Sequence, residues 1–298
     1  MADVLLVTCA ALPDGETGGD LLVEELASRG VDAAWAAWDD AGVDWAAARL
    51  VLVRSTWDYE SRREEFIAWA DAVGPTLVNG AAAFAWNTDK AYLVDLGATD
   101  LPVVPTVVAD EEGELAPAVA TFAPAVVKPR VGAGGRGVVV FDGEPGGPAG
   151  LDESRLALGP WVVQPLVESV HTEGETSVFV LGGEAVSQVR KRPAGDEIRV
   201  HEEYGGRTDA VPLDDEAARL SVAAVRTAED LLGVPLPYAR ADLMRLDDGR
   251  LALSELEITE PGLYLDVVPA NAGAFADLVA HLLDAAPAAS QARKRPGR

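Results

Sequence analysis

The sequence predicts an α/β segment with a parallel sheet, followed by a larger α+β region. Up to about residue 80, short apolar runs alternate with amphipathic stretches, and helices between buried strands are typical of a parallel sheet. From about residue 100, apolar strands follow one another directly, and glycine-containing turns join some of them into hairpins. We therefore expect two regions with different sheet topologies.

In the α/β segment, each expected helix ends at a glycine and each expected strand is short and apolar. The expected strands are residues 4–8, 50–53 and 76–78, and the expected helices are residues 20–29 and 61–72. Ligand-binding loops lie at the carboxyl ends of parallel strands. The loop Arg54-Ser55-Thr56-Trp57-Asp58-Tyr59 follows the second strand and occupies such a position.

In the α+β region, the turns Gly182-Gly183 and Asp247-Asp248-Gly249-Arg250 predict two hairpins. The expected strands are residues 103–108, 125–128, 138–141, 161–164, 177–181, 185–190, 239–246 and 251–258, and the expected helices are 214–232 and 272–285. We place the domain boundary near residue 87, so that residues 1–86 form an N-terminal domain and residues 87–285 a second one. Within the second domain, residues 101–163 are expected to form a lid, and residues 286–298 a disordered basic tail.

Composition narrows the function classes. The formal net charge is −25, whereas a nucleic-acid-binding surface is basic, so no nucleic-acid partner is expected. No apolar run reaches 18 residues, so no membrane partner is expected either. One cysteine, Cys9, excludes an internal disulfide framework, and we expect a cytoplasmic protein. Because cations are scarce, the places where they gather are informative.

A glycine-rich segment lies between two expected strands. Gly132, Gly134 and Gly137 match the dinucleotide-binding pattern G-x-G-x-x-G, but that pattern must open a helix, and β-branched residues follow here. A nicotinamide oxidoreductase is therefore disfavoured. We interpret the segment, with Gly134 and Gly135 at its tip and Lys128 before it, as a flap that closes over a triphosphate. A glycine-rich hairpin without a ligand is the alternative.

Three acids lie on the last predicted hairpin. Asp242 is on one strand, and Glu255 and Glu257 are two residues apart on the next, so all three can face the same side. Hard oxygen ligands of this kind suit Mg²⁺, which also binds phosphate oxygens. A solvated strand face is the alternative, which the flanking leucines disfavour.

Further candidates are less specific. Backbone groups near Gln164 and Leu166 can pair with an adenine edge, and Glu168 with ribose hydroxyls. The cation cluster Arg190, Lys191, Arg192, Arg199 and Arg207 predicts a clamp on the γ-phosphate and a substrate carboxylate, or else a basic surface loop. The side chains of Arg54, Trp57, Asp58 and Tyr59 are candidates for amino-acid recognition, or pack a domain interface.

Together these motifs resemble the ATP-grasp superfamily, in the branch of glutathione synthetase and ribosomal-protein glutamate ligases. The motifs occur in the family order: Asn87-Thr88-Asp89-Lys90, Lys128 with the glycine flap, residues 164–168, Arg199 with Gly205-Gly206, and the three acids. The segments 54–59 and 86–90 are similar to the group that contains the cyclo-ligase of D-cycloserine biosynthesis. The resemblance implies an ATP-grasp fold, in which two α+β subdomains clasp ATP after an N-terminal parallel α/β domain.

The resemblance also implies site roles. Lys90 and Lys128 would hold ATP phosphates, Gln164 and Leu166 the adenine, and Glu168 the ribose. Catalytic roles fall to Lys128 and to Arg199 at the transferred phosphoryl group. From the cation cluster itself, Arg190 and Arg192 are candidates for binding a substrate carboxylate, with a catalytic role expected for Arg190. Asp242 and Glu255 would bind one or two Mg²⁺ ions, and Glu257 stands where the family commonly has asparagine.

The expected function is that of an ATP-dependent carboxylate–amine ligase. It would act on a small amino-acid-like substrate through an acyl phosphate, and it would either join two molecules or close a ring, as in the conversion of O-ureido-D-serine to D-cycloserine. A small-molecule kinase, an amino-acid or peptide ligase and a non-catalytic nucleotide-binding module are the alternatives. Substrate-dependent ADP release separates the last of these from the others.

Overall fold

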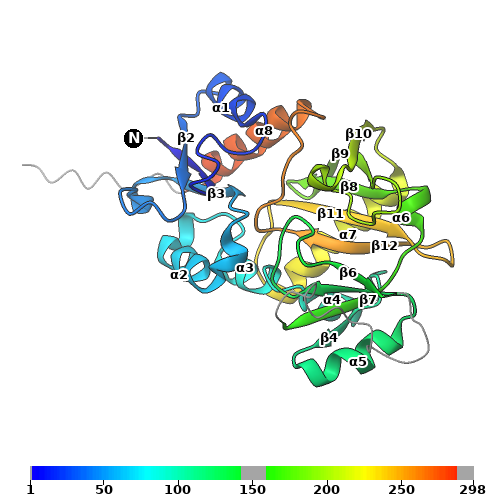
Figure 1. The fold of residues 1–298 in the computed structure, drawn as a ribbon. Coiled ribbons are helices and arrows are strands. Elements are labelled where there is room, and N and C mark those ends of the chain that lie inside the picture. Colours follow the sequence, from blue (N-terminus) through cyan, green and yellow to red (C-terminus); the bar gives the residue numbers. More distant parts are fainter. Residues whose placement is uncertain (1, 142–158, 287–298) are drawn as a thin grey trace, which may run out of the picture.

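A computed structural model describes residues 2–141 and 159–286 of the chain. A parallel three-stranded sheet with its helices lies beside a five-stranded antiparallel sheet, and a smaller four-stranded sheet lies below the latter (Figure 1). The predicted change from α/β to α+β architecture is therefore confirmed. Among the described residues, none of the helices combines the length and apolar character that crossing a membrane requires.

The parallel sheet has the order β2-β1-β3, and β1 pairs in parallel with both neighbours. Its strands are β1 (Val4–Thr8), β2 (Ala33–Ala37) and β3 (Leu50–Ser55), and its helices include α1 (Gly19–Ser28) and α2 (Arg63–Val73). β2 was not predicted, because its sequence is mostly alanine and lacks β-branched residues. The strand predicted at 76–78 is reduced to a bridge between Leu77 and Val51, since a 3₁₀ turn at Gly74–Thr76 precedes it.

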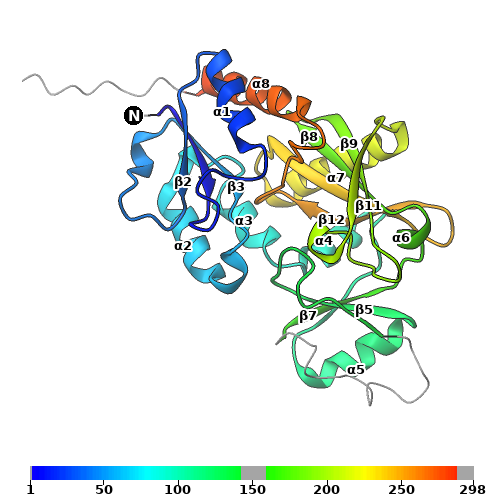
Figure 2. The same ribbon diagram turned by 45° about the horizontal axis from the view of Figure 1, so that its top comes forward.

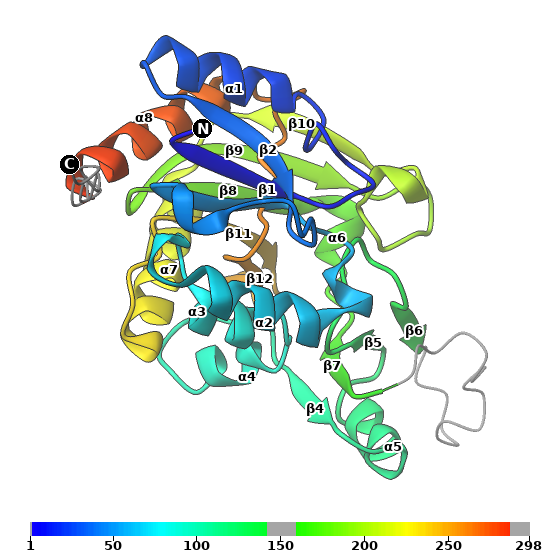
Figure 3. The ribbon, with the colours of Figure 1, turned by 90° about the vertical axis from the view of Figure 1, so that its left-hand side faces the viewer.

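The last helix, α8 (Ala270–Ala285), returns to the N-terminal segment and packs beside α1 (Figure 3). Leu22 and Leu26 of α1 share one buried core with Phe275 and Val279 of α8. Residues 1–86 therefore complete their core with the end of the chain. The domain boundary at residue 87 remains a prediction about the order of domains along the chain. It does not separate two hydrophobic cores, because α8 contributes to the core of the N-terminal segment.

The five-stranded sheet has the order β10-β9-β8-β11-β12, and each of its pairings is antiparallel. Its strands are β8 (Glu175–Leu181), β9 (Glu184–Arg192), β10 (Arg207–Val211), β11 (Tyr238–Arg245) and β12 (Leu251–Glu257). Both predicted hairpins are confirmed. The long helix α7 (Asp215–Leu232) packs against one face with Ala224, Val225 and Ala228, which leaves the other face for the site.

The four-stranded sheet has the order β4-β7-β5-β6 and is covered by α5 (Figure 2). Its elements are β4 (Val107–Ala109), β5 (Ala125–Pro129), β6 (Val139–Phe141), β7 (Trp161–Pro165) and α5 (Glu112–Thr121). The helix α5 was not predicted, although Glu111 and Glu114 form a capping box at its start. The glycine-rich segment joins the antiparallel strands β5 and β6, as predicted.

Short helices connect the sheets and position the site. They are α3 (Ala81–Asn87), α4 (Tyr92–Gly97) and α6 (Ser169–Thr172). The amide of Asn87 donates to the Leu256 carbonyl and accepts from the Ile258 amide, which fixes the end of α3 against β12. Lys90, three residues later, is thereby held beside the last hairpin. The tail predicted beyond residue 286 lies outside the described residues.

Candidate functional site

A cavity of about 480 Å³ lies between the sheets and the N-terminal loops. Its lining includes the glycine-rich segment between β5 and β6, the end of β7, and the strands β9, β11 and β12. Loops of the α/β unit and the segment 260–266 also line it. Segments from all three sheets thus meet at a single cavity, which is large enough for a small ligand. Each candidate residue is placed below relative to this cavity.

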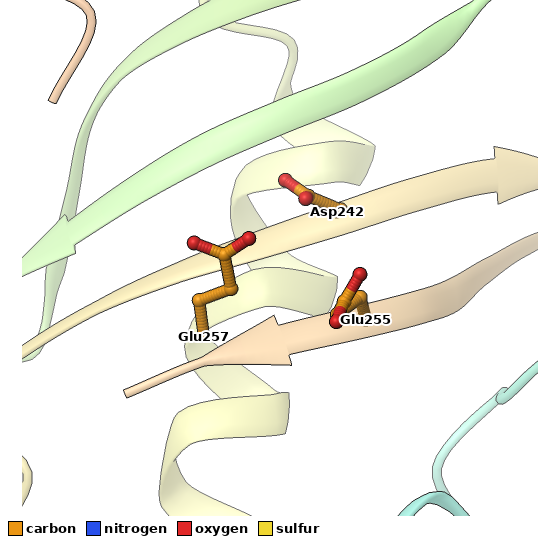
Figure 4. A group of neighbouring side chains, drawn as sticks. All are labelled: Asp242, Glu255 and Glu257. Carbon is orange, nitrogen blue, oxygen red and sulfur yellow. The ribbon is translucent and has the colours of Figure 1, made fainter. Parts of the chain in front are cut away.

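Asp242, Glu255 and Glu257 lie together at the cavity. Asp242 on β11 is directly opposite Glu255 on β12, and the register places Glu257 opposite Arg240. One oxygen from each carboxylate lies within 4.8 Å of the others, and Figure 4 shows all three side chains on the same side of the hairpin. In an octahedral Mg²⁺ site, ligand oxygens on opposite sides of the ion are about 4.2 Å apart. A small inward movement of the three carboxylates would bring their oxygens to such separations, and carboxylate oxygens are ligands that suit Mg²⁺.

Two buried cations compensate the central acid. Arg240 donates to both Asp242 oxygens at 2.9 Å and also pairs with Glu257, and Lys191 Nζ lies 3.1 Å from Asp242. Burial alone would raise the pKa of Asp242, but Arg240 and Lys191 outweigh it and hold the pKa well below its usual range. Arg240 was not among the predicted site residues, although its spacing of two residues from Asp242 on one strand places both side chains on the same face.

Two further lysines project toward the same cavity. Lys90 Nζ lies 2.9 Å from Glu255 and donates to the Gly132 carbonyl at 2.8 Å. Burial opposes the charge on Lys90, yet Glu255 outweighs it and the pKa is raised. Lys128 on β5 also lines the cavity, and burial lowers its pKa. The structure therefore brings both predicted phosphate-binding lysines to the side that faces the acids.

The glycine-rich segment closes one wall of the cavity. Gly134 and Gly135 have φ angles of 61° and 69°, a region that favours glycine. A Cβ atom on Gly135 would lie 3.0 Å from His201 Nδ1 and 3.3 Å from Arg199 Cδ, so the segment packs directly against these side chains. Arg199 itself pairs with Glu197 and lies over the Tyr204 ring at 3.5 Å. Arg199 therefore reaches the cavity beside the flap.

The end of β7 lies at the cavity as predicted, but its polar groups are partly engaged. The Gln164 side-chain amide donates to Thr106 Oγ1 at 2.9 Å, and the Leu166 backbone amide donates to the Pro124 carbonyl at 3.0 Å. Glu168 is exposed, and among the described residues it is not part of the cavity lining. The short helix α6 begins immediately after it, and the acid that lines the cavity near this end is Glu175.

Strand alternation separates the members of the cation cluster. Lys191 on β9 reaches the cavity and pairs with Asp242 and Glu175, whereas its neighbours Arg190 and Arg192 face the opposite side of the sheet. Arg192 pairs with Asp209, and Arg190 lines a separate pocket near Gln188. The predicted roles of Arg190 and Arg192 at the substrate are therefore not supported, and of these three consecutive cations it is Lys191 that lines the cavity.

The predicted site residues of the loop after β3 are likewise divided between those that line the cavity and those that do not. Arg54 is fully buried and does not reach the cavity surface; its Nη2 pairs with Glu16 at 2.8 Å and donates to the Pro261 carbonyl, whereas its Nε and Nη1 are buried without a hydrogen-bond partner among the described residues. Asp58 accepts a hydrogen bond from Trp38 Nε1. Within the part of the chain that the structure describes, neither residue lines the cavity, whereas Trp57 and Tyr59 do. The predicted substrate contacts of Arg54 and Asp58 are thus not supported.

Comparison with family models supplies independent evidence. Residues 4–79 match the model described as D-cycloserine synthetase DcsG, N-terminal domain. Residues 95–234 match the model described as prokaryotic glutathione synthetase, ATP-grasp domain. The two matches cover the parallel α/β unit and most of the region that forms the cavity.

Comparison with whole proteins gives the same result. The chain is 32% identical over 279 residues to the cycloserine biosynthesis protein DcsG of Streptomyces lavendulae, which covers 88% of this chain and 92% of that protein. The crystal structure of D-cycloserine synthetase DcsG superposes with a TM-score of 0.82 at 29% identity, over 94% of this chain and 99% of the other. The ATP-grasp ligase PsnB, solved with a minimal precursor, Mg and ADP, has a TM-score of 0.62 at 17% identity, covers 95% and 98%, and shows a shared fold.

Proposed function

We propose that this chain, which belongs to the glutathione-synthetase-like ATP-grasp ligases, uses ATP to join a carboxylate to an amine nitrogen of a small amino-acid-like substrate. One observation carries the proposal. Lys90, Lys128 and the glycine flap line the same cavity as the three carboxylates, and Lys90 lies 2.9 Å from Glu255. A triphosphate held between cations and acid-bound metal is the arrangement that phosphoryl transfer requires.

At the phosphate end, Lys90, Lys128 and Arg199 would offset the charge of ATP. At a separation of about 4 Å and an effective dielectric of 20, one opposite-charge pair contributes about 4 kcal/mol, so several cations are needed in a chain this acidic. Asp242, Glu255 and Glu257 would hold Mg²⁺, which supplies charge neutralisation at the phosphate oxygens. The cations that now pair with these acids would exchange partners when Mg-ATP enters.

At the adenine end, we assign base recognition to the backbone around Gln164 and to the apolar side chain of Leu166. The Leu166 backbone amide already donates a hydrogen bond to the Pro124 carbonyl. We therefore assign the hydrogen bond to the edge of the adenine ring to the next backbone amide, that of Val167. Val167 is buried and lines the cavity. The ribose contact falls to Glu175 in place of Glu168.

At the opposite end, the lining suits an amino acid. Arg240 offers a guanidinium to a carboxylate, while Glu260 offers a carboxylate to an ammonium group, and Trp57, Tyr59 and Tyr264 line the same cavity. Burial raises the pKa of Glu260 to about 7 and that of Glu257 to about 8, so a neighbouring ammonium group would stabilise their ionised forms. A zwitterion would bring both the ammonium group and the carboxylate.

The chemistry follows from this order of groups. A substrate carboxylate oxygen attacks the γ-phosphorus, the bond to the ADP oxygen breaks, and an acyl phosphate forms. An amine nitrogen then attacks the acyl carbon, loses its proton, and phosphate leaves. The flap at Gly134 and Gly135 would exclude water, which otherwise hydrolyses the acyl phosphate. Similarity to DcsG over nearly its whole length favours a ring-closing reaction of the D-cycloserine type.

ADP release in the presence of Mg-ATP tests the proposal. The substrates are a panel of amino acids with their ureido, hydroxamate and amino-oxy derivatives, and the products are identified by mass. We expect one ADP and one phosphate per amide formed, with a cyclic product from an ureido-serine. A stable phosphorylated product would instead establish a kinase, and an intermolecular amide would establish an amino-acid or peptide ligase. Absence of substrate-dependent ADP release would contradict all three.

A further inference from the structure

Glu60 joins the α/β unit to the glycine flap. It lies in the 3₁₀ turn Tyr59–Ser61, immediately after the loop that lines the substrate end. One of its carboxylate oxygens accepts from the Ala133 backbone amide at 3.0 Å, and the other accepts from Arg136 Nε at 2.6 Å. Arg136 also donates to the Trp57 carbonyl at 3.3 Å. A single acid from one unit thus holds a backbone amide and a side chain of the flap.

The loop that carries Glu60 also contacts the substrate end. Trp57 Nε1 donates to the Glu260 carbonyl at 3.3 Å, and Tyr59 bonds to the Glu260 side chain. Trp57 and Tyr59 line the cavity on this side, and Ala133 and Arg136 of the flap also line it. The loop 54–60 therefore contacts both ends of the cavity through residues that are at most three positions apart.

Among the described residues, the flap has few other attachments. Its Gly132 carbonyl accepts from Lys90, which also pairs with Glu255, and Gly135 packs on the His201 ring. Gly134 and Gly137 have φ angles of 61° and 71°, a region that favours glycine. The two bonds from Glu60, together with the bond from Arg136 to the Trp57 carbonyl, attach the flap to the substrate loop.

We infer that Glu60 is a positioning residue that couples the substrate loop 54–60 to closure of the glycine flap over the ATP phosphates. The inference rests on the proposed function, because it assigns the flap to ATP. A substrate that orders Trp57 and Tyr59 also orders Glu60, which holds the Ala133 amide and Arg136 in the closed position. Coupling is reciprocal, so a nucleotide that closes the flap must also order the loop 54–60.

The test uses Mg-AMPPNP as the probe, with binding measured by calorimetry and flexibility by hydrogen–deuterium exchange. In the wild type, we expect Mg-AMPPNP to protect both residues 131–138 and residues 54–60. In Glu60→Ala, we expect about tenfold weaker binding, since charge-assisted hydrogen bonds are lost, and no protection of residues 54–60. Glu64→Ala, an exposed acid on α2, is the matched control and should behave as wild type.

A double-mutant cycle distinguishes a specific contact between Glu60 and Arg136 from a general loss of order in the flap. If Glu60 acts through Arg136, Arg136→Ala and the double variant should weaken binding no more than Glu60→Ala alone. Glu60→Gln, which still accepts from Ala133, should fall between wild type and Glu60→Ala. Additive effects, or retained protection of residues 54–60 in Glu60→Ala, would overturn the coupling. A wild-type protein that does not bind Mg-AMPPNP would instead overturn the proposed function, a result distinct from unchanged binding in the variant.

Discussion

The ammonium group of Lys90 lies 2.9 Å from the Glu255 carboxylate, so a candidate phosphate-binding cation and a candidate metal-binding acid neutralise each other. The same ammonium donates to the Gly132 carbonyl of the flap. Entry of Mg-ATP would give each group a new partner of opposite charge. The exchange would therefore leave neither Lys90 nor Glu255 with an unpaired charge.

Replacing Lys90 tests this exchange. Lys90→Ala removes one cation from the phosphate end and frees Glu255, so we expect Mg-AMPPNP to bind at least about tenfold more weakly, the equivalent of about 1.4 kcal/mol. Calorimetric titration measures the affinity. Arg226→Ala, an exposed cation on α7, is the control for net charge. Equal affinities in the wild type and Lys90→Ala would remove Lys90 from the phosphate site.

Because side chains alternate between the two faces of β9, substitutions of the neighbouring cations Lys191 and Arg190 should have different effects on turnover. Lys191 is buried between Asp242 and Glu175, so Lys191→Met should abolish most turnover and lower the free energy of unfolding by about 3 kcal/mol, as expected when a buried ion loses its partner. Arg190 faces the other side of the sheet, so Arg190→Gln should keep kcat/KM within about twofold of wild type. Steady-state kinetics and denaturant unfolding measure both. A loss in Arg190→Gln as large as that in Lys191→Met would contradict the placement.

The pair also shows what the sequence could and could not predict. The hairpin was predicted from the turn 247–250, and the common face of Glu255 and Glu257 from their spacing of two, but the pairing of Asp242 with Glu255 depends on a register shift between Asp242 and Leu243 that the turn does not set. The turn Gly182-Gly183 likewise predicts the hairpin of β8 and β9, but the register shifts between Phe179 and Val180, so the turn alone does not assign the three consecutive cations to faces. Glu168 was misplaced for a related reason, because the four-residue helix α6 has no periodic signal.

Arg54 illustrates a second limit, which is that buried partners far apart in sequence are invisible to local patterns. Its partner Glu16 lies 38 residues earlier, and the Pro261 carbonyl lies 207 residues later. The ring of Phe275, on the helix that returns to α1, lies 4.8 Å from the guanidinium. A charged residue after a buried strand predicts a ligand contact, and only the tertiary packing shows that this one is enclosed.

We therefore predict a structural phenotype for Arg54. Arg54→Met leaves Glu16 buried without its cation, which should lower the free energy of unfolding by about 3–5 kcal/mol. The double variant Glu16→Gln with Arg54→Met removes both charges and should recover part of that loss. Urea unfolding followed by circular dichroism measures both. A fully stable Arg54→Met that fails only to bind substrate would restore the original sequence-based assignment.

Glu260 predicts a pH dependence of stability. Burial raises its pKa to about 7, above the value of about 4.3 for an unfolded glutamate, so the folded state binds the proton more tightly. The free energy of unfolding should then fall as pH rises from about 4.3 to 7, by about 4 kcal/mol at most. Glu260→Gln should remove this part of the slope, while Glu257, whose pKa is raised by burial to about 8, leaves a decline that extends from about 4.3 to 8.

The same titration predicts how a substrate ammonium binds. An ionised Glu260 attracts the ammonium and a protonated one does not, so affinity for a cationic amino-acid ligand should rise as pH increases through about 7 and then level off. Binding should release a proton near neutral pH, which calorimetry detects as a dependence of the measured heat on the buffer. In Glu260→Gln, both the rise and the proton release should vanish, with affinity fixed near the low-pH value of the wild type. An unchanged pH profile in that variant would place the ammonium away from Glu260.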